Sequence, residues 1–182
     1  MTPQTSNTIM SAAEMATAIE SLAKKICEAH SSADTIYLLG ILSRGRPLAD
    51  RIAARIEQIT GNTPRVGSLS TTLYRDDLRS GKVAPKLGGS ETHFDFDVDG
   101  NCVVMVDDVL NSGRTIRAAL DEIMDYGRPS RIQLACLIDR GLREVPIQAD
   151  YLGKSIQTSP GDHVQVKLVE LDGEDSVVLT QS

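Results

Sequence analysis

Residues 102–115, which read CVVMVDDVLNSGRT, decide the fold. An apolar run, CVVMV, ends in two adjacent aspartates, Asp107 and Asp108, and the later residues TIRAALDEIMDYG have the apolar spacing of a helix that Gly127 ends. The run predicts a buried strand, and a strand followed by a helix is the repeating unit of a parallel α/β sheet. Because ligands bind beyond the carboxyl ends of such strands, the two aspartates are expected at a binding site.

The turn between this strand and this helix, NSGRT, has the composition of a phosphate cradle. Backbone N–H groups at a helix N-terminus favour an anion, Gly113 allows a close approach, and Ser112 and Thr115 add hydroxyl donors. The carboxylates of Asp107 and Asp108 would bind ribose hydroxyls, a hydrated Mg²⁺, or both. A sugar phosphate satisfies both subsites together. The alternative is that the acidic pair only caps the helix beside a solvated loop.

The rest of the chain continues the alternation of strands and helices. Apolar spacing predicts the elements, and Ser11 with Glu14 forms a candidate capping box before the first helix. The expected elements are a helix at 11–29, a strand at 35–42, a helix at 44–61, a strand that begins at 65, strands at 101–106 and 131–139 around the helix at 115–127, and short β segments at 147–152, 163–171 and 176–180. Residues 76–100 lack periodicity and indicate a long functional or disordered loop. This order predicts one α/β domain with a smaller C-terminal β portion.

Composition and charge narrow the class of protein. The 182 residues suffice for one core, and with 41% hydrophobic and 3% aromatic residues that core must be aliphatic. The net charge of −6 argues against a surface wholly devoted to nucleic acid, but it allows a local basic patch. Three cysteines, an odd number, and scattered histidines favour reduced thiols and argue against zinc. With no bilayer-length apolar run and no secretory signal, we expect a cytoplasmic protein without membrane contact.

The stretch VVMVDDVLNSGRT resembles the phosphoribosyl pyrophosphate (PRPP) motif of type I phosphoribosyltransferases. The segments LGILSRGRPLA, TLYRDDL, DYGRP and LIDRGLREVPIQADYLGK look like the subgroup of pyrimidine operon attenuation regulators with uracil phosphoribosyltransferase activity, the PyrR type. The resemblance covers nearly the whole chain. It implies a single type I phosphoribosyltransferase domain over 1–182, with a central, mainly parallel sheet flanked by helices, a flexible lid loop at about 74–98 and a small C-terminal β hood at about 140–182.

The reaction that the resemblance implies is displacement of pyrophosphate from C1 of PRPP by uracil, which gives UMP and diphosphate with Mg²⁺ as cofactor. Mg²⁺ near Asp107 and Asp108 would neutralise the leaving group, and the carboxylates would favour positive charge on the ribose. Tyr74 and Arg75 of the lid would complete the catalytic set, while the lid excludes water. The residues implied to bind the 5′-phosphate are Asn111, Ser112, Gly113, Arg114 and Thr115.

The loop after the strand at 35–42 is implied to bind pyrophosphate. Backbone groups of Ser43, Arg44 and Gly45 would make the contacts, and Arg46 is an additional candidate ligand. Two cations at a helix N-terminus are unfavourable without an anion, which favours pyrophosphate over the alternative of a solvated helix start.

The identity of the base depends on Asn111. The 6-oxopurine enzymes of the superfamily carry an aspartate at this position and a lysine on the following strand, where this chain has Asp139. An amide cannot act as a general base, so both differences favour uracil over hypoxanthine or guanine. Uracil-type regulators often have tyrosine in place of Asn111, so this chain departs from their pattern too. Two alternatives to a uracil enzyme therefore stay open. The first is a PRPP-binding regulator with little turnover, and the second, less favoured, is a 6-oxopurine enzyme. The base is expected near Arg140, for which a surface salt bridge is the alternative, and near the backbone around Val164.

The resemblance also implies binding of a messenger RNA leader that depends on uridine nucleotides. Such binding needs a basic face. The candidate contacts are Lys24, Arg143 and Lys154, with Lys25, Arg128 and Arg131 as further members. The acidic net charge argues against this role, as does Leu142, where the family commonly has histidine. Catalysis or nucleotide binding therefore ranks first. Aliphatic faces on the chain are compatible with a homo-oligomer, a dimer or larger.

Overall fold

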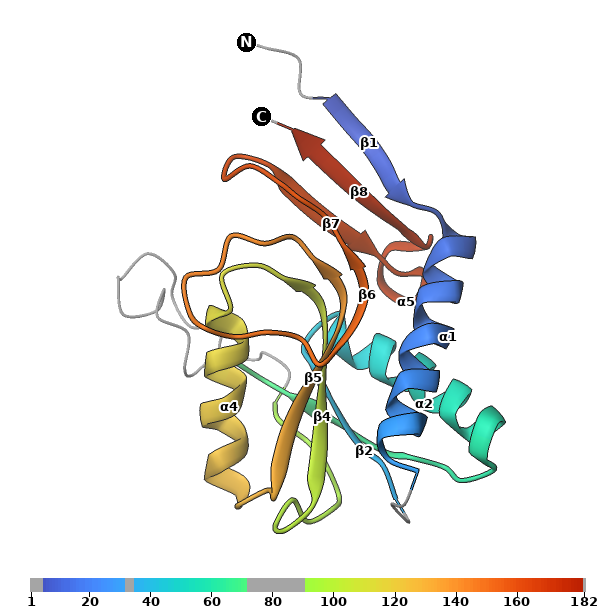
Figure 1. Ribbon diagram of the computed structural model, residues 1–182, viewed down its shortest axis with the longest axis vertical. Coiled ribbons are helices and arrows are strands. Elements are labelled where there is room, and N and C mark those ends of the chain that lie inside the picture. Colours follow the sequence, from blue (N-terminus) through green and yellow to red (C-terminus); the bar gives the residue numbers. More distant parts are fainter. Residues whose placement is uncertain (1–4, 32–34, 72–90, 182) are drawn as a thin grey trace.

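A five-stranded parallel sheet forms the centre of the molecule (Figure 1). The structure is a computed structural model that describes residues 5–31, 35–71 and 91–181. The strand order is β3 (Arg65–Leu69), β2 (Tyr37–Ile41), β4 (Cys102–Leu110), β5 (Arg131–Asp139) and β6 (Tyr151–Ser155). Each neighbouring pair is parallel. The predicted α/β fold with a central parallel sheet is confirmed.

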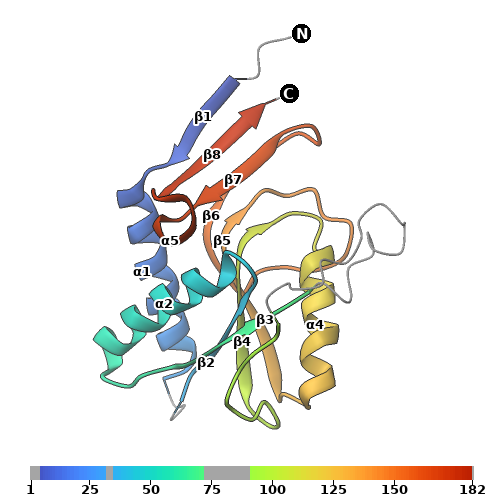
Figure 2. The ribbon, with the colours of Figure 1, turned by 180° about the vertical axis from the view of Figure 1, so that it is seen from behind.

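Helices cover both faces of this sheet, as Figures 1 and 2 show from opposite sides. The helices α1 (Ala12–Ala29) and α2 (Gly45–Thr60) lie on one face, and α4 (Arg114–Tyr126) lies on the other. Val104 and Val106 of β4 pack in the core under α1 and α2, whereas Val103 and Met105 pack in the core under α4. Because both faces are buried, the strand is apolar throughout, and this is why CVVMV carries no alternating polar residues.

A small antiparallel sheet stands beside the large one, with the strand order β1 (Thr5–Met10), β8 (Ser176–Gln181) and β7 (His163–Lys167). The short helix α5 (Val169–Asp172) connects β7 to β8. No strand was predicted at residues 5–10, whose only apolar pair stands at the end of a polar run. Their strand conformation comes from pairing with β8, at the other end of the chain. The segment at 151–155, in contrast, joins the large sheet.

The long unpatterned loop is described only in its last part. From residue 91 to residue 100 the backbone forms a single isolated bridge, between Ser68 and His93. The remainder of the expected lid, with Tyr74 and Arg75, lies outside the described residues. Over the described ranges, the structure contains no helix with the length and apolar character needed to cross a membrane.

Candidate active site

The predicted carboxylates, turn and loop meet at the carboxyl edge of the large sheet. A cavity of about 190 Å³ opens there. Its lining comes from the loop after β2, from the end of β4 and from the start of α4, and comprises Ile41, Leu42, Ser43, Arg44, Thr71, Asp107, Asp108, Val109 and Thr115. Segments that are some 60 residues apart in sequence, at 41–44 and 107–109, therefore share one cavity, as the strand-end argument predicts.

Asp107 and Asp108 are buried to different degrees in this cavity. Asp107 is only 7% exposed, and Asp108 is half-buried. Burial raises the pKa of the Asp107 carboxyl well above its usual range, and the charge of Asp108 raises it further. Burial also raises the pKa of Asp108, although a hydrogen bond from the Val109 backbone N–H and the charge of Arg44 oppose the rise. Within the described ranges, no lysine or arginine forms an ion pair with either aspartate. The pair therefore favours a cation or hydroxyl donors.

The chemistry of this pair fits Mg²⁺ held together with a substrate. Mg²⁺ takes oxygen ligands and is commonly bound through one or two carboxylates plus substrate phosphates. The described part of the chain holds no cluster of three or more His, Cys, Asp or Glu that would form an all-protein metal cage. Two carboxylates at the edge of a polar cavity match the substrate-dependent kind of site. Asp107 and Asp108 are the residues that would hold the ion.

The turn before α4 has the backbone geometry of an anion site. Gly113 lies at φ 88°, and a Cβ there would stand 2.6 Å from Cγ2 of Val145, so both conformation and space require glycine. The helix begins at Arg114, directly after this residue, and its first backbone N–H groups have no partner one turn back in the helix. Thr115 lines the cavity from the same turn.

The segment at 143–147 holds this turn from behind. Arg143 donates from Nη1 to the carbonyl of Asn111 over 2.7 Å, and backbone N–H groups of Glu144 and Val145 donate to the carbonyl of Ser112 over 2.9 and 3.2 Å. Arg114 forms an exposed ion pair with Glu144, at 2.7 Å. Carbonyl groups of the turn are thus tied to the protein behind it, while the Arg114 N–H donates to Oγ of Ser112 within the turn over 3.3 Å.

The loop after β2 packs directly against β4. The peptide bond between Leu42 and Ser43 is cis. A Cβ on Gly45 would stand 2.3 Å from the carbonyl oxygen of Val106, so no side chain fits between loop and strand. The structure also supplies the anions that the charge argument required. Arg44 pairs with Asp172 at 2.9 Å, and Arg46 pairs with Asp50 at 3.0 Å. The positive charge at the start of α2 is therefore no evidence for pyrophosphate by itself. Binding of pyrophosphate through the backbone of this loop stays a prediction.

Arg140 is an internal side chain and not the surface salt bridge of the alternative. It is 7% exposed, and it donates to Oγ1 of Thr158 and to the carbonyls of Ser159 and Asp162 over 3.1, 3.3 and 2.9 Å. These bonds fix the loop that leads into β7, where Val164 is buried. Arg140 thus supports the segment that carries the other predicted base contact.

The candidate RNA contacts are engaged within the protein. Arg143 donates to the carbonyls of Asn111, Gly141 and Ile147 and to the carboxylate of Asp139. The two candidate lysines also have partners within the chain, Lys154 as a half-buried residue of β6 and Lys24 as an exposed residue of α1. Lys154 donates to the carbonyl of Ile9 at 2.7 Å, and Lys24 pairs with Glu20 while its side chain remains 58% exposed.

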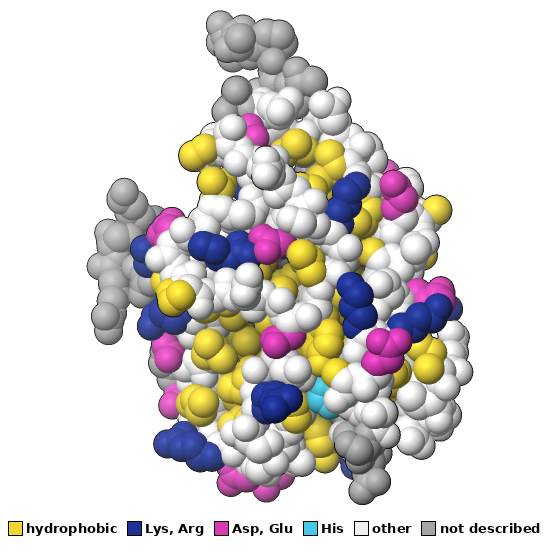
Figure 3. Space-filling view, viewed as in Figure 1, with side chains coloured by type: hydrophobic (Ala, Val, Ile, Leu, Met, Phe, Trp, Pro, Cys, Tyr) yellow, Lys and Arg dark blue, Asp and Glu magenta, His cyan; other side chains and the backbone are white. Residues whose placement is uncertain are grey.

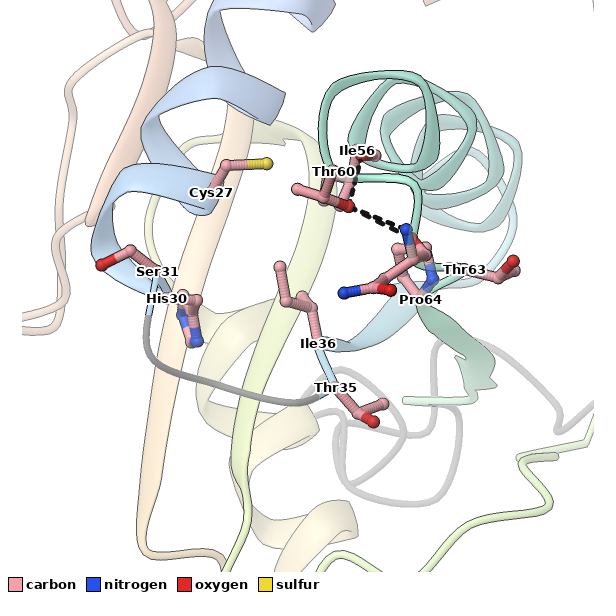
Figure 4. A pocket seen from close by; sticks show the side chains of 10 residues that line it. Cys27, His30, Ser31, Thr35, Ile36, Ile56, Thr60, Thr63 and Pro64 are labelled. Atoms are coloured by element: carbon pink, nitrogen blue, oxygen red, sulfur yellow. Dashed lines mark hydrogen bonds between the residues drawn. The ribbon is translucent and has the colours of Figure 1, made fainter.

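A second cavity of about 120 Å³ lies at the opposite edge of the sheet (Figure 4). It is bordered by the C-terminal ends of α1 and α2 and by the start of β2. Its described lining is apolar, hydroxyl or amide in character, apart from Cys27 and His30. Of the two cavities, only the one at Asp107 combines carboxylates with a helix N-terminus.

Comparison with known proteins agrees with this geometry. Residues 6–171 match the family described as Phosphoribosyl transferase domain. The chain belongs to this family. It is 47% identical over 173 residues to the Bifunctional protein PyrR of Clostridioides difficile (strain 630), with 95% of this chain and 97% of that protein covered. It is 51% identical over 171 residues to the Bifunctional protein PyrR of Chloroflexus aurantiacus, with 94% and 93% covered. These identities place it among the PyrR-type phosphoribosyltransferases.

Solved phosphoribosyltransferases share the fold. The hypoxanthine phosphoribosyltransferase of Trypanosoma cruzi in complex with IMP superposes with a TM-score of 0.72 at 18% identity, over 96% of this chain and 93% of that chain. A hypoxanthine-guanine phosphoribosyltransferase of Bacillus anthracis superposes with a TM-score of 0.68 at 18% identity, over 97% and 98%. At these identities the likeness shows the fold alone.

Sequence reasoning missed two features of the site. Thr71 lines the cavity, although nothing in the pattern around it sets it apart from other loop residues. Arg44 reaches across to the small sheet, to a carboxylate that is 128 residues away in sequence. A lone arginine and a lone aspartate at that separation carry no sequence signal for a contact.

Proposed function

We propose that this PyrR-type phosphoribosyltransferase transfers the phosphoribosyl group of PRPP to uracil, with Mg²⁺, to give UMP and diphosphate. One observation carries the proposal. The buried pair Asp107 and Asp108 shares a cavity with the N-terminal turn of α4, so a carboxylate subsite and an anion subsite adjoin as a ribose 5-phosphate requires. The loop at Ser43 lines the same cavity and supplies backbone groups for the pyrophosphate.

The residues of the cavity have distinct tasks in this reaction. The turn at 111–115 binds the 5′-phosphate and fixes the ribose. The carboxylates of Asp107 and Asp108 accept from ribose hydroxyls and favour the positive charge that develops on the ring as pyrophosphate departs. When bound, Mg²⁺ supplies neutralisation of the pyrophosphate charge. A lid at about 74–98, with Tyr74 and Arg75, is proposed to exclude water, and the hood at about 140–182 is proposed to cover the base.

Uracil is the base that the residues around Asn111 support best. The Asn111 side chain is exposed and has no hydrogen-bond partner within the described ranges, so its amide remains available to a ligand. An amide both donates and accepts hydrogen bonds, but it cannot remove a proton as an aspartate would. Asp139 accepts hydrogen bonds from Arg143 and from the backbone N–H of Gly141, and a carboxylate offers no lysine-like donor to a purine oxygen.

The test is a base assay with PRPP and Mg²⁺. Radiolabelled uracil, guanine, hypoxanthine and orotate are supplied separately, and nucleotide formation is measured. UMP formation is expected with uracil. Product from a purine but none from uracil would contradict the assignment, and nucleotide binding without turnover of any base would favour the regulator alternative. A variant with both Asp107→Asn and Asp108→Asn is expected to lose turnover, and retained activity would rule out the carboxylate role.

Binding of a messenger RNA leader is proposed as a second function, because the curated relatives are named bifunctional. On the face shown in Figure 3, lysine and arginine side chains are interspersed with acidic and apolar ones. Filter binding of a pyrimidine-gene leader RNA, with and without UMP and over a salt series, tests this role. UMP-dependent retention with a steep salt dependence is expected. Equal retention of an unrelated RNA would contradict it.

Two further properties belong to this proposal. The three free cysteines are consistent with the reducing cytoplasm, where we place the protein. Val169 and Leu171 of α5 are 55% and 50% exposed, and these apolar side chains support a homo-oligomer. Light scattering coupled to size exclusion measures the oligomeric mass directly. A monomeric mass at all concentrations would contradict this part of the proposal.

A further inference from the structure

Arg44 connects the loop after β2 to the small sheet. Its Nε donates to the carbonyl of Val166 in β7 over 2.7 Å, and its Nη2 donates to both carboxylate oxygens of Asp172 over 2.9 and 3.2 Å. Asp172 in turn accepts from the backbone N–H of Leu168 over 2.9 Å. The side chains of Arg44 and Asp172 are 29% and 21% exposed, so the contact is only partly shielded from water.

A second arginine, Arg51 of α2, holds the segment that connects β7 to β8. Arg51 pairs with Glu170 of α5 at 2.5 Å and with Asp175, just before β8, at 2.8 Å. Arg44 and Arg51 are seven residues apart, which places them on one face of α2, two turns from each other. The two contacts are not equivalent, because Arg51 lies inside the helix, whereas Arg44 belongs to the loop that lines the cavity.

The strand that Arg44 contacts is the strand on which the base is expected. Val164 and Val166 are both buried and are two positions apart, so they lie on the same face of β7. A bond from Arg44 to the carbonyl of Val166 therefore reaches the backbone two residues from Val164. One side chain links the loop proposed to bind pyrophosphate with the strand proposed to bind the base.

We propose that Arg44 and Asp172 form a positioning pair, which fixes the base-binding strand β7 relative to the pyrophosphate-binding loop. This inference rests on the proposed function, because it takes its two subsites from there. In a displacement at C1 the base attacks opposite the departing pyrophosphate, so the two subsites must keep a fixed separation and direction. Asp172 holds the guanidinium of Arg44 in place, and the hydrogen bond from Arg44 to Val166 fixes β7 relative to the loop.

The pair makes a specific kinetic prediction for Asp172→Asn. Asparagine retains an oxygen that can accept from the Leu168 N–H, so the turn at α5 is kept while the ion pair to Arg44 is lost. We expect the KM for the base to rise by about tenfold or more, since small misplacements of reacting groups have effects up to about 100-fold. The KM for PRPP should change little, because the 5′-phosphate turn and Asp107 are untouched.

Glu174→Gln is the matched control. It removes the same charge from the same region, where Glu174 pairs with Lys167 of β7 at 2.7 Å; among the described residues, Glu174 forms no hydrogen bond or ion pair with α2. We expect its KM values to equal those of the wild type. Arg44→Gln and the double variant Arg44→Gln with Asp172→Asn complete a cycle. If the two side chains act as one unit, the double variant is no worse than the more impaired single variant.

Hydrogen exchange supplies a measurement that needs no base. Magnesium pyrophosphate alone is added to the full chain, and the exchange of the amides at 163–167 is followed by mass spectrometry. We expect pyrophosphate to slow this exchange in the wild type and in Glu174→Gln, and to leave it unchanged in Asp172→Asn. Coupling between loop and strand would produce this difference, whereas a general loss of stability would speed exchange regardless of pyrophosphate.

Each outcome of these experiments decides for or against the pair. The kinetic measurements use whichever base the wild type accepts. If the wild type accepts none, the proposed function fails. In that case the hydrogen-exchange experiment alone tests whether Arg44 and Asp172 act as a positioning pair. Unprotected β7 amides in the wild type with pyrophosphate, or protected ones in Asp172→Asn, would overturn the inference. So would a base KM for Asp172→Asn equal to that of Glu174→Gln.

Discussion

Replacing Asp107 by asparagine should stabilise the folded protein while it removes activity. The Asp107 carboxyl is 7% exposed, its pKa is raised well above the usual range, and its neighbour Asp108 also has a raised pKa. At neutral pH the two adjacent carboxylates therefore lower the stability of the folded state, mainly because they lose hydration and partly because they repel each other. Asparagine removes one charge and keeps an oxygen for the Asp108 N–H, which Asp107 Oδ1 accepts at 3.0 Å.

The magnitude of the gain follows from the removal of one buried charge beside another. Relieving the lost hydration and the repulsion of one buried carboxylate should raise the unfolding free energy by about 1–3 kcal/mol near pH 8, the usual size of a desolvation penalty for one buried polar group. For a chain of this length that is roughly 2–10 °C in Tm. The sign depends on pH. A carboxyl whose folded pKa is raised weakens the folded state as pH rises from the unfolded value, about 3.9, through the folded one. Below about pH 4 the wild type and the variant should therefore have equal stability.

The assay is thermal unfolding of both proteins in a pH series, with UMP formation measured in parallel. Asp121→Asn is the matched control, because Asp121 forms an exposed ion pair with Arg117 at 3.0 Å and should change stability by no more than about 0.5 kcal/mol. An Asp107→Asn protein that is less stable than the wild type near pH 8, or a difference that does not vary with pH, would refute the reasoning. Saturating Mg²⁺ and PRPP should raise the Tm of the wild type more than that of the variant.

Three other variants test single elements of the site. Gly113→Ala should lower the Tm and raise the KM for PRPP, because alanine at φ 88° is strained and its Cβ would clash with Val145; a wild-type KM would contradict this. Arg140→Met should raise the KM for the base with little change for PRPP, because three acceptors of the loop before β7 lose their donor; an unchanged base KM would argue against that support. Arg143→Gln should destabilise the fold by about 2–4 kcal/mol and weaken PRPP binding, because the carbonyl of Asn111 loses its donor. A variant that keeps the wild-type Tm and loses only RNA binding would instead assign Arg143 to RNA contact.

The strand and turn at 102–115 were predictable because their signals are local. An apolar run that is buried on both faces, an acidic end and a glycine turn before an amphipathic helix all lie within one stretch, and the strand-end rule then places them at a site. The strand β1 was not predictable in this way. Residues 5–10 form a strand through pairing with β8 at the other end of the chain, and the polar residues at 5–8 give no periodic signal of their own.

The roles of the arginines show the same limit at the level of side chains. Sequence reasoning placed Arg44 and Arg140 near the site, and the structure brings Arg44 to the cavity and Arg140 beneath the loop that leads to β7. Their partners are a carboxylate and three acceptors from distant segments, and charge pattern alone cannot select them. The charge at the start of α2 is not itself evidence for a phosphate anion, because Asp172 and Asp50 pair with Arg44 and Arg46, and pyrophosphate binding there stays a prediction.

The contact between Gly45 and the carbonyl of Val106 has a consequence for redesign of this protein. Backbone lies against backbone there, so no side chain can be introduced at Gly45 without separating the proposed pyrophosphate loop from β4. The region from Arg140 to Val164, in contrast, is built from side chains and a loop, which sequence changes can alter. A library that seeks a new base preference should therefore vary residues 139–164 and leave 40–45 untouched. These two regions of one active site differ in how far mutation can change them.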